Sequence, residues 1–247
     1  MLEAPKQFTV LGLPVHLLNN LDDYSHWLGE RLQQKLGSQV VTLNAEMAME
    51  AQGNRGLASI IRQAELVIPD GAGVILYLRL QGERWRRTPG IELAQSLLHK
   101  AGQLGESCPV FFYGGVPGVA LQAGRFWQQQ LPQLAIAGIN HGYLSPEAEQ
   151  ELQITLKERQ PRLILVGLGV PRQEFWIAQH RHLCPQAIWI GVGGSFDIWA
   201  GTKSRAPIWL RDNNLEWLYR LYQEPKRWRR MMALPKFALK AIGHFWA

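Results

Sequence analysis

The sequence has little cysteine and no long apolar run. Only two of its 247 residues are cysteine, Cys108 and Cys184, which excludes a disulfide framework and favours a reducing compartment. The longest apolar stretches, such as residues 163–170, are too short to span a bilayer. Residues 1–6 form neither a basic nor an apolar run, so we expect no secretory signal. These absences favour a cytoplasmic protein.

Several motifs of common enzyme chemistry are also missing. The sequence has no P-loop lysine motif, no G-x-S-x-G motif, and no cysteine and histidine cluster with metal-ligand spacing. It also has no Asp-x-Asp pair, which would hold a divalent ion against a nucleotide diphosphate. We therefore expect no metal or other cofactor. If the substrate is a nucleotide sugar, other groups must neutralise its diphosphate.

The sequence does contain a regular alternation of short apolar runs and segments with helical spacing. Several runs are almost continuously apolar, which is typical of strands covered on both faces. The alternation favours an α/β fold with a doubly wound, mostly parallel sheet. The predicted strands are residues 8–11, 39–43, 66–69, 109–113, 134–139, 162–166 and 187–192. The predicted helices are residues 21–36, 45–64, 90–104, 117–131, 146–159 and 171–183.

Basic residues are concentrated at the end of the chain. The net charge is +6, but residues 203–247 hold 10 Lys and Arg against 3 Asp and Glu, so this stretch alone carries +7. The same stretch contains Trp209, Trp217, Trp228 and Trp246. Basic residues interleaved with tryptophan favour an anionic membrane surface over nucleic acid. We therefore expect an α/β catalytic domain, residues 1–202, and a basic helical appendage, residues 203–247.

The last part of the appendage has the pattern of an interfacial helix. Lys236, Lys240 and His244 recur every four positions and would form one polar stripe. The flanking apolar residues are Phe237, Leu239, Ile242, Phe245 and Trp246. Such a helix can lie in a membrane interface. The alternative is a structural helix that packs on the rest of the protein.

Polar residues follow two predicted strands, at the edge where parallel sheets bind ligands. Thr42 and Asn44 are two positions apart, so in extended chain they point the same way. Asn44 also suits the cap of the following helix. Asp70 ends the next strand before two glycines, and either a general base or a turn-forming residue fits this position.

Glycine-rich turns follow three other predicted strands. The turn at Gly167-Leu168-Gly169 begins like a dinucleotide-binding motif, but Arg172 stands where the third glycine belongs. A nicotinamide cofactor is therefore disfavoured, whereas a phosphate or sugar suits a glycine turn that leads into a helix. The other glycine turns are Gly114-Gly115 and Gly191-Val192-Gly193-Gly194. Each of them also fits a tight structural turn.

Taken together, these motifs resemble the WecG/TagA/CpsF family of bacterial glycosyltransferases. The motifs occur in the family's order and extend from about Thr42 to Arg230. They are residues 42–45, 69–73, 87–92, 112–118, 141–143, 166–174, 191–197, 205–207 and 215–220. A single match of this kind is weak evidence, but nine in order are specific.

The resemblance implies a Rossmann-like fold and an inverting transfer from a UDP-sugar, typically UDP-N-acetylmannosamine or its uronic acid. It implies an acceptor of N-acetylglucosamine on undecaprenyl diphosphate, and products that enter teichoic acids or other surface polysaccharides. The family's general base falls on Asp70, and its sugar-pocket positions fall on Thr42, Asn44 and Gln173. Further substrate-binding positions are taken as Arg87, Gly114, Gly115, Gly169, Gly193 and Gly194.

The resemblance also implies a basic C-terminal appendage, which falls on residues 203–247. Because the Asp-x-Asp pair is missing, we expect this appendage both to dock on the inner face of the cell membrane and to complete the active site. Arg220, Arg227 and Arg230 are then the candidates for stabilising the leaving diphosphate, with Arg211 a further candidate. We expect no nucleic-acid partner and leave an oligomer open. Two alternatives remain at this point: a Rossmann-type oxidoreductase, and a non-enzymatic nucleic-acid-binding protein that uses the basic tail.

Overall fold

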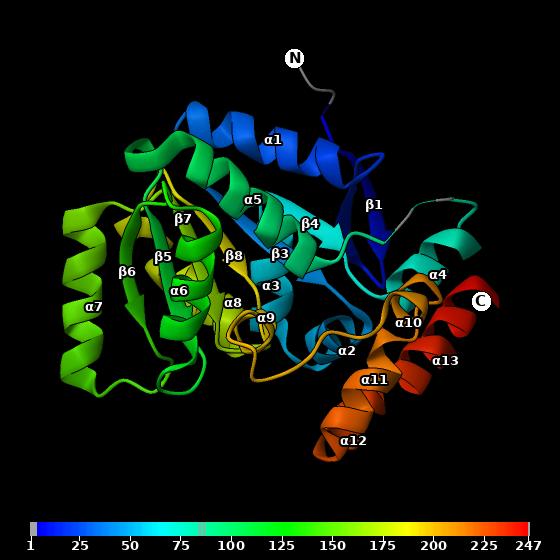
Figure 1. Ribbon diagram of the computed structural model, residues 1–247. Helices are drawn as coiled ribbons and strands as arrows, with labels where there is room; N and C mark the ends of the chain where they lie inside the picture. Colours follow the sequence, from blue (N-terminus) through cyan, green and yellow to red (C-terminus); the bar gives the residue numbers. More distant parts are fainter. Residues whose placement is uncertain (1–3, 84, 86, 247) are drawn as a thin grey trace.

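The chain forms one six-stranded parallel sheet with helices on both faces (Figure 1). The structure, a computed structural model, describes residues 4–83, 85 and 87–246, and leaves the side chains of residues 244–246 undescribed. The strands, in spatial order, are β4 (Leu66–Pro69), β3 (Ser38–Leu43), β8 (Ile188–Gly191), β7 (Leu163–Gly167), β5 (Val110–Gly114) and β6 (Ile136–Asn140). Residues in β3, β4, β5 and β8 are buried throughout, as the continuous apolar runs predict.

Helices cover the two faces of the sheet with separate apolar clusters. One face packs against α1 (Leu21–Gln33), α5 (Gly90–Leu104), α6 (Val119–Gln130) and α9 (Ser195–Trp199). The other packs against α2 (Ala45–Gly53), α3 (Arg55–Gln63), α4 (Ala72–Leu80), α7 (Pro146–Arg159) and α8 (Arg172–His180). The predicted α/β class is therefore confirmed. Ser145 caps α7, since its hydroxyl oxygen accepts a hydrogen bond from the amide of Ala148.

The first predicted strand is not part of this sheet. It is β1 (Lys6–Val10), which pairs antiparallel with β2 (Leu13–Leu17) in a separate two-stranded sheet. The prediction missed β2, because the turn between the two strands is only Leu11 and Gly12. Both of these residues have positive φ, and leucine is an unusual choice there.

Two helix predictions are also wrong. The predicted helix 45–64 is two helices, because Asn54 ends α2 and its side chain caps α3 by accepting the amide of Leu57. Helix α4 was missed, because its sequence is almost continuously apolar and shows no helical period.

The end of the chain is helical, as predicted. It comprises α10 (Ile208–Asp212), α11 (Glu216–Gln223), the short η3 (Pro225–Arg227), α12 (Trp228–Met231) and α13 (Ala233–Trp246). Pro235 lies in the first turn of α13, where its missing N–H costs nothing. No helix among the described residues is long and apolar enough to cross a membrane.

Helix α13 packs on the core rather than standing free (Figure 1). Phe237 and Ala241 are buried against α2 and α4, and the ring centroids of Phe237 and Tyr77 are 6.0 Å apart. We expected Phe237 to share an exposed face with Leu239 and Ile242, and this is wrong, because only the latter two are exposed. Lys240 donates to the side chain of Gln52. His244, Phe245 and Trp246 of the predicted stripe and its flank lie outside the described side chains.

Candidate active site

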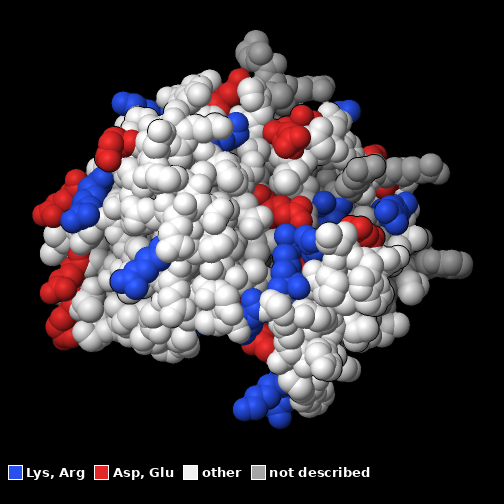
Figure 2. Space-filling view, viewed as in Figure 1, with Lys and Arg blue, Asp and Glu red and all other residues white. Residues whose placement is uncertain are grey.

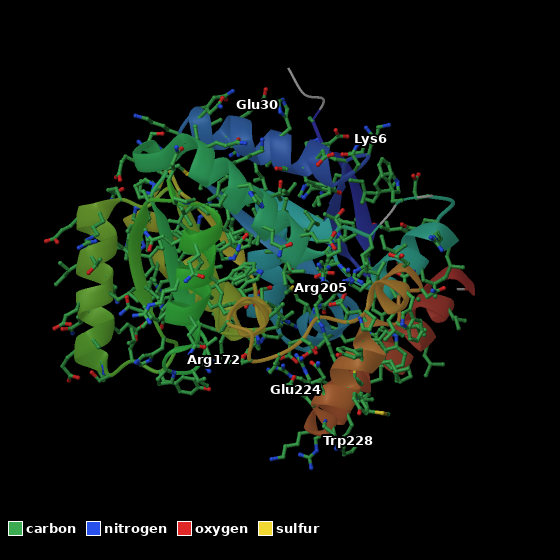
Figure 3. All side chains as sticks on the ribbon, viewed as in Figure 1. Lys6, Glu30, Arg172, Arg205, Glu224 and Trp228 are labelled. Carbon is green, nitrogen blue, oxygen red and sulfur yellow. The ribbon has the colours of Figure 1, made fainter. Side chains whose placement is uncertain are left out.

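A large cavity lies at the carboxyl edge of the sheet, where the C-terminal helices meet the core. Its volume is about 550 Å³, and polar surface predominates in its lining. Residues that follow all six parallel strands contribute to it: Asn44, Asp70, Gly115, Gly142, Leu168 and Val192. Figure 3 labels Arg172 of the core and Glu224 of the C-terminal part, which line it from the two sides. This is the position at which parallel sheets bind ligands.

Asp70 lies at the end of β4 with its carboxylate held from two directions. Its Oδ1 accepts a hydrogen bond from Nε of Arg87 at 3.3 Å, and its Oδ2 accepts one from the amide of Gly90 at 3.3 Å. The carboxylate remains partly exposed and lines the cavity. The helix after it is capped by Gly71, without a side-chain bond from Asp70. The turn-forming alternative for Asp70 therefore has no hydrogen bond to support it, and its carboxylate remains open to a ligand.

Arg87 joins Asp70 to the C-terminal helices. Its Nη2 lies 2.5 Å from Oε2 of Glu216, the first residue of α11, and the other oxygen of Glu216 lies 2.7 Å from Nη2 of Arg220. Burial alone would raise the pKa of Glu216, but Arg220 and Arg87 outweigh it and lower that pKa to about 2. Burial opposes the charge on Arg87, but Asp70 and Glu216 together raise its pKa. The four side chains thus form one alternating chain of charges.

The other predicted arginines of the appendage also line the cavity, each beside a carboxylate. Arg227 lies 2.9 Å from Glu224, and Arg230 lies 3.1 Å from Glu46 of α2. Arg211, the further candidate, pairs instead with Glu92 and is not among the residues that line the cavity. The three arginines that do line it give the cavity three cationic groups, all supplied by the last 45 residues.

Thr42 and Asn44 both line the cavity, as their spacing predicts. Asn44 also has the structural role that the sequence left open, because its Oδ1 accepts the amide of Met47 and caps α2. The NH₂ group of the Asn44 side-chain amide is therefore the part that remains for a ligand. Thr42 is nearly buried and packs against Gly90, where a side chain would clash.

The predicted glycines divide into two groups. Gly115, Gly169, Gly193 and Gly194 line the cavity. Gly114 does not; it sits at the end of β5 with φ of +137°, so close to Gly167 that a side chain would collide with that backbone. Gln173 lines the cavity too, but its amide is engaged with the backbone of two glycine turns.

Sequence reasoning missed several charged residues of the cavity. Lys203 is one, and its Nζ lies 2.7 Å from Glu224 and 3.5 Å from Asp197. Glu46 and Glu224 are others, and Glu216 lines the smaller cavity described next; each of the three is the partner of a predicted arginine. The only local signal was their charge, since the partners come from distant parts of the chain. Among the described residues, no group of three or more His, Cys, Asp or Glu could hold a metal ion.

A second, smaller cavity shares Asp70 with the first. Its volume is about 150 Å³, and its lining includes Asp70, Arg87, Arg220, Arg227 and Arg230 together with more apolar residues. The apolar side comes from α4 and the C-terminal helices, as Ala72, Trp217, Met231 and Leu234. Asp70 therefore stands where a polar cavity and a partly apolar one meet.

Comparison with known proteins gives consistent matches over nearly the whole chain. Residues 8–247 match the family described as "Glycosyl transferase WecG/TagA/CpsF family". A protein of Bacillus spizizenii is 36% identical over 237 residues, covering 94% of this chain and 91% of its own. A protein of Bacillus subtilis is 34% identical over 236 residues, covering 95% and 90%. Both are named N-acetylglucosaminyldiphosphoundecaprenol N-acetyl-beta-D-mannosaminyltransferase. These names do not favour the oxidoreductase or nucleic-acid alternatives.

Proposed function

The chain belongs to the WecG/TagA/CpsF family of glycosyl transferases, and we propose that it transfers an N-acetylmannosamine-type sugar from a UDP-sugar to N-acetylglucosamine on undecaprenyl diphosphate. The observation that carries this proposal is the match of over 90% of the chain to two transferases named for that reaction. The position of Asp70 between two cavities supports it, because a transferase needs a donor site and an acceptor site that share one base.

The larger cavity suits the UDP-sugar. Its glycine turns let backbone amides approach a phosphate closely, and Arg172 stands in the first turn of α8. Arg220, Arg227 and Arg230 face the same space and would stabilise the charge of the departing diphosphate. Because these arginines supply the positive charge, we propose that the reaction needs no metal ion.

The reaction we propose is a single displacement with inversion. The acceptor hydroxyl attacks the anomeric carbon, Asp70 takes its proton, and the bond from that carbon to the diphosphate oxygen breaks as UDP leaves. A positioned base of this kind contributes about 10²–10⁴ in rate. Arg87 and the amide of Gly90 hold the carboxylate of Asp70 in place by their hydrogen bonds.

The smaller cavity suits the acceptor, because its apolar side lies among the helices that also carry exposed apolar residues. On α10, α11 and α13 these are Ile208, Trp209, Trp217, Leu218, Tyr222, Leu239 and Ile242. Figure 2 shows that the C-terminal helices at the lower right present a surface with few charged atoms, beside a band of Lys and Arg. We propose that this apolar face rests on the inner face of the membrane, where the lipid-linked acceptor is found.

The test is release of UDP in the presence of a lipid diphosphate that carries N-acetylglucosamine, measured across a panel of nucleotide sugars. We expect release with UDP-N-acetylmannosamine or its uronic acid, and only when the acceptor is present. Folded Asp70→Asn protein is the matched control for background hydrolysis. Release that is independent of acceptor, or absent with every UDP-sugar, would contradict the proposal.

A further inference from the structure

One buried side chain links two of the glycine turns that line the larger cavity. The amide oxygen of Gln173, which is only 2% exposed, accepts hydrogen bonds from the backbone N–H of Gly169 and of Gly193, each at 3.1 Å. Gly169 follows β7, and Gly193 follows the neighbouring strand β8. An amide oxygen has two lone pairs, and both are used here. Gln173 therefore acts as a clamp that fixes the spacing of the two turns.

Glu174 decides which way the amide of Gln173 points. Nε2 of Gln173 donates to Oε1 of Glu174 at 2.8 Å, so the carboxyl holds the nitrogen end and leaves the oxygen toward the two N–H groups. The opposite orientation would set an NH₂ group against two backbone donors. Gly191 makes room for this arrangement, because a side chain there would collide with Nε2 of Gln173.

A contribution to the stability of the fold does not explain why residue 174 is a glutamate. The residue is buried, and its Oε2 has no hydrogen-bond partner among the described residues. Burial raises the pKa of its carboxyl to about 7, despite hydrogen bonds from Gln173 and the backbone. A buried carboxyl with an unpartnered oxygen is a cost to the fold that an apolar side chain of similar size would avoid. Glu174 is also not among the residues that line the cavity, so it does not itself meet a ligand.

We infer that Glu174 is a positioning residue for the donor diphosphate: it orients the Gln173 amide, which in turn holds the Gly169 and Gly193 turns at the spacing that receives the phosphates. This inference rests on the proposed function, since it takes UDP as the ligand of those turns. It also gives Gln173 a role different from direct contact with the sugar. Loss of the clamp affects donor binding more than the proton transfer at Asp70, which lies on a different strand.

The experiment compares Glu174→Gln, which keeps an acceptor oxygen, with Glu174→Met, which removes it at similar volume. Calorimetric titration with UDP and steady-state kinetics with the donor are measured on both. We expect Glu174→Gln to bind UDP within about threefold of wild type. Glu174→Met is expected to bind it at least tenfold more weakly, with KM for the donor raised more than kcat is lowered. Its melting temperature should be unchanged or higher, because an unpartnered carboxyl has been removed.

A swapped pair tests the direction of the hydrogen bond. Gln173→Glu alone sets two carboxyls against each other and should weaken UDP binding at pH 8. Adding Glu174→Gln restores the hydrogen bond in the reverse direction, with the new amide at position 174 donating to the new carboxylate at position 173. The double variant should recover most of the lost UDP affinity. Wild-type UDP affinity and KM in Glu174→Met, or no recovery in the swapped pair, would overturn the inference.

Amide hydrogen exchange tests the clamp without any ligand. The N–H groups of Gly169 and Gly193 should exchange faster in Glu174→Met than in wild type and Glu174→Gln. Unchanged exchange in Glu174→Met would again overturn the inference. If wild-type protein binds no UDP, but Gly169 and Gly193 still exchange faster in Glu174→Met than in wild type, the donor assignment is refuted. The clamp itself is then retained.

Discussion

Glu216 of α11 accepts a hydrogen bond from Arg87, which lies 129 positions earlier in the core. Arg87 also donates to Asp70, so the proposed base is tied to the C-terminal helices through one guanidinium. Neutralising Glu216 would remove one of the two carboxylates that pair with Arg87, the other being that of Asp70. The geometry of the site and the docking of these helices are therefore coupled.

The first prediction concerns Asp70. Asp70→Asn keeps the size of the side chain and an oxygen for Arg87 or Gly90, but it cannot take a proton at the carboxylate. Turnover should fall by about 10² or more while UDP affinity stays within a few-fold. Acceptor-dependent UDP release and a thermal melt check this. A folded variant with nearly wild-type turnover would rule out the general-base role.

The second prediction concerns Glu216 and pH. Its pKa in the folded protein is about 2, below the ordinary value of 4.5, because Arg220 and Arg87 outweigh burial. The stabilisation it gives is therefore complete above pH 4.5 and is lost as the pH falls toward 2, by an amount on the order of 2–3 kcal/mol. Glu216→Gln should lower the free energy of unfolding at pH 7 and make much less difference near pH 2.5.

Denaturant unfolding at the two pH values measures this, with Glu158→Gln as the matched control. Glu158 is an exposed residue of α7, and its substitution should have little effect at either pH. The same loss of stability for Glu216→Gln at both pH values would show that its charge is not what matters.

The third prediction concerns the leaving diphosphate. Arg227 lines both cavities, whereas Arg229 of α12 lines neither and stacks near Trp228. Arg227→Gln should reduce turnover and weaken UDP binding by about tenfold or more, whereas Arg229→Gln should change neither on a soluble acceptor.

Removal of metal ions tests the same account of the leaving diphosphate. EDTA should leave most of the wild-type activity in place. Strict dependence on added Mg²⁺ or Mn²⁺ would mean that the arginines are not sufficient.

The sequence predicts the fold where burial imposes a clear pattern. The six strands of the parallel sheet were all found, because strands covered on both faces are continuously apolar. The same property explains why α4 was missed: its apolar residues lie on all sides of the helix, so its sequence shows no helical periodicity. The β1–β2 hairpin was missed because Leu11-Gly12 is not a familiar turn sequence.

The site was predictable only where its residues follow strands. Asp70 and Thr42 could be found because carboxyl ends of parallel strands share one edge. Glu216 and Lys203 could not, because their importance comes from partners far away in the sequence, and no local spacing encodes those pairs. Gln173 was assigned to the sugar pocket, yet its hydrogen bonds to Gly169 and Gly193 depend on how two neighbouring turns are placed.

The last prediction concerns the apolar face of the C-terminal helices. Trp209 is 63% exposed on α10 and Tyr222 is 81% exposed on α11, which is costly in water unless another surface covers them. Neither lines the two cavities described above. Trp209→Ser together with Tyr222→Ser should therefore weaken binding to anionic liposomes by about tenfold or more, yet leave turnover on a soluble acceptor within about twofold.

Ile154→Ser on α7 is the control for this pair. Ile154 is also an exposed apolar residue, 54% exposed, but it lies on α7, away from the C-terminal helices (Figure 1), so its loss should not change liposome binding. Cosedimentation with vesicles and the soluble assay are run on the same preparations. Because Trp209 and Tyr222 are both exposed, these substitutions change the surface without removing a buried side chain. Unchanged liposome binding in the pair would place the membrane contact elsewhere on the molecule.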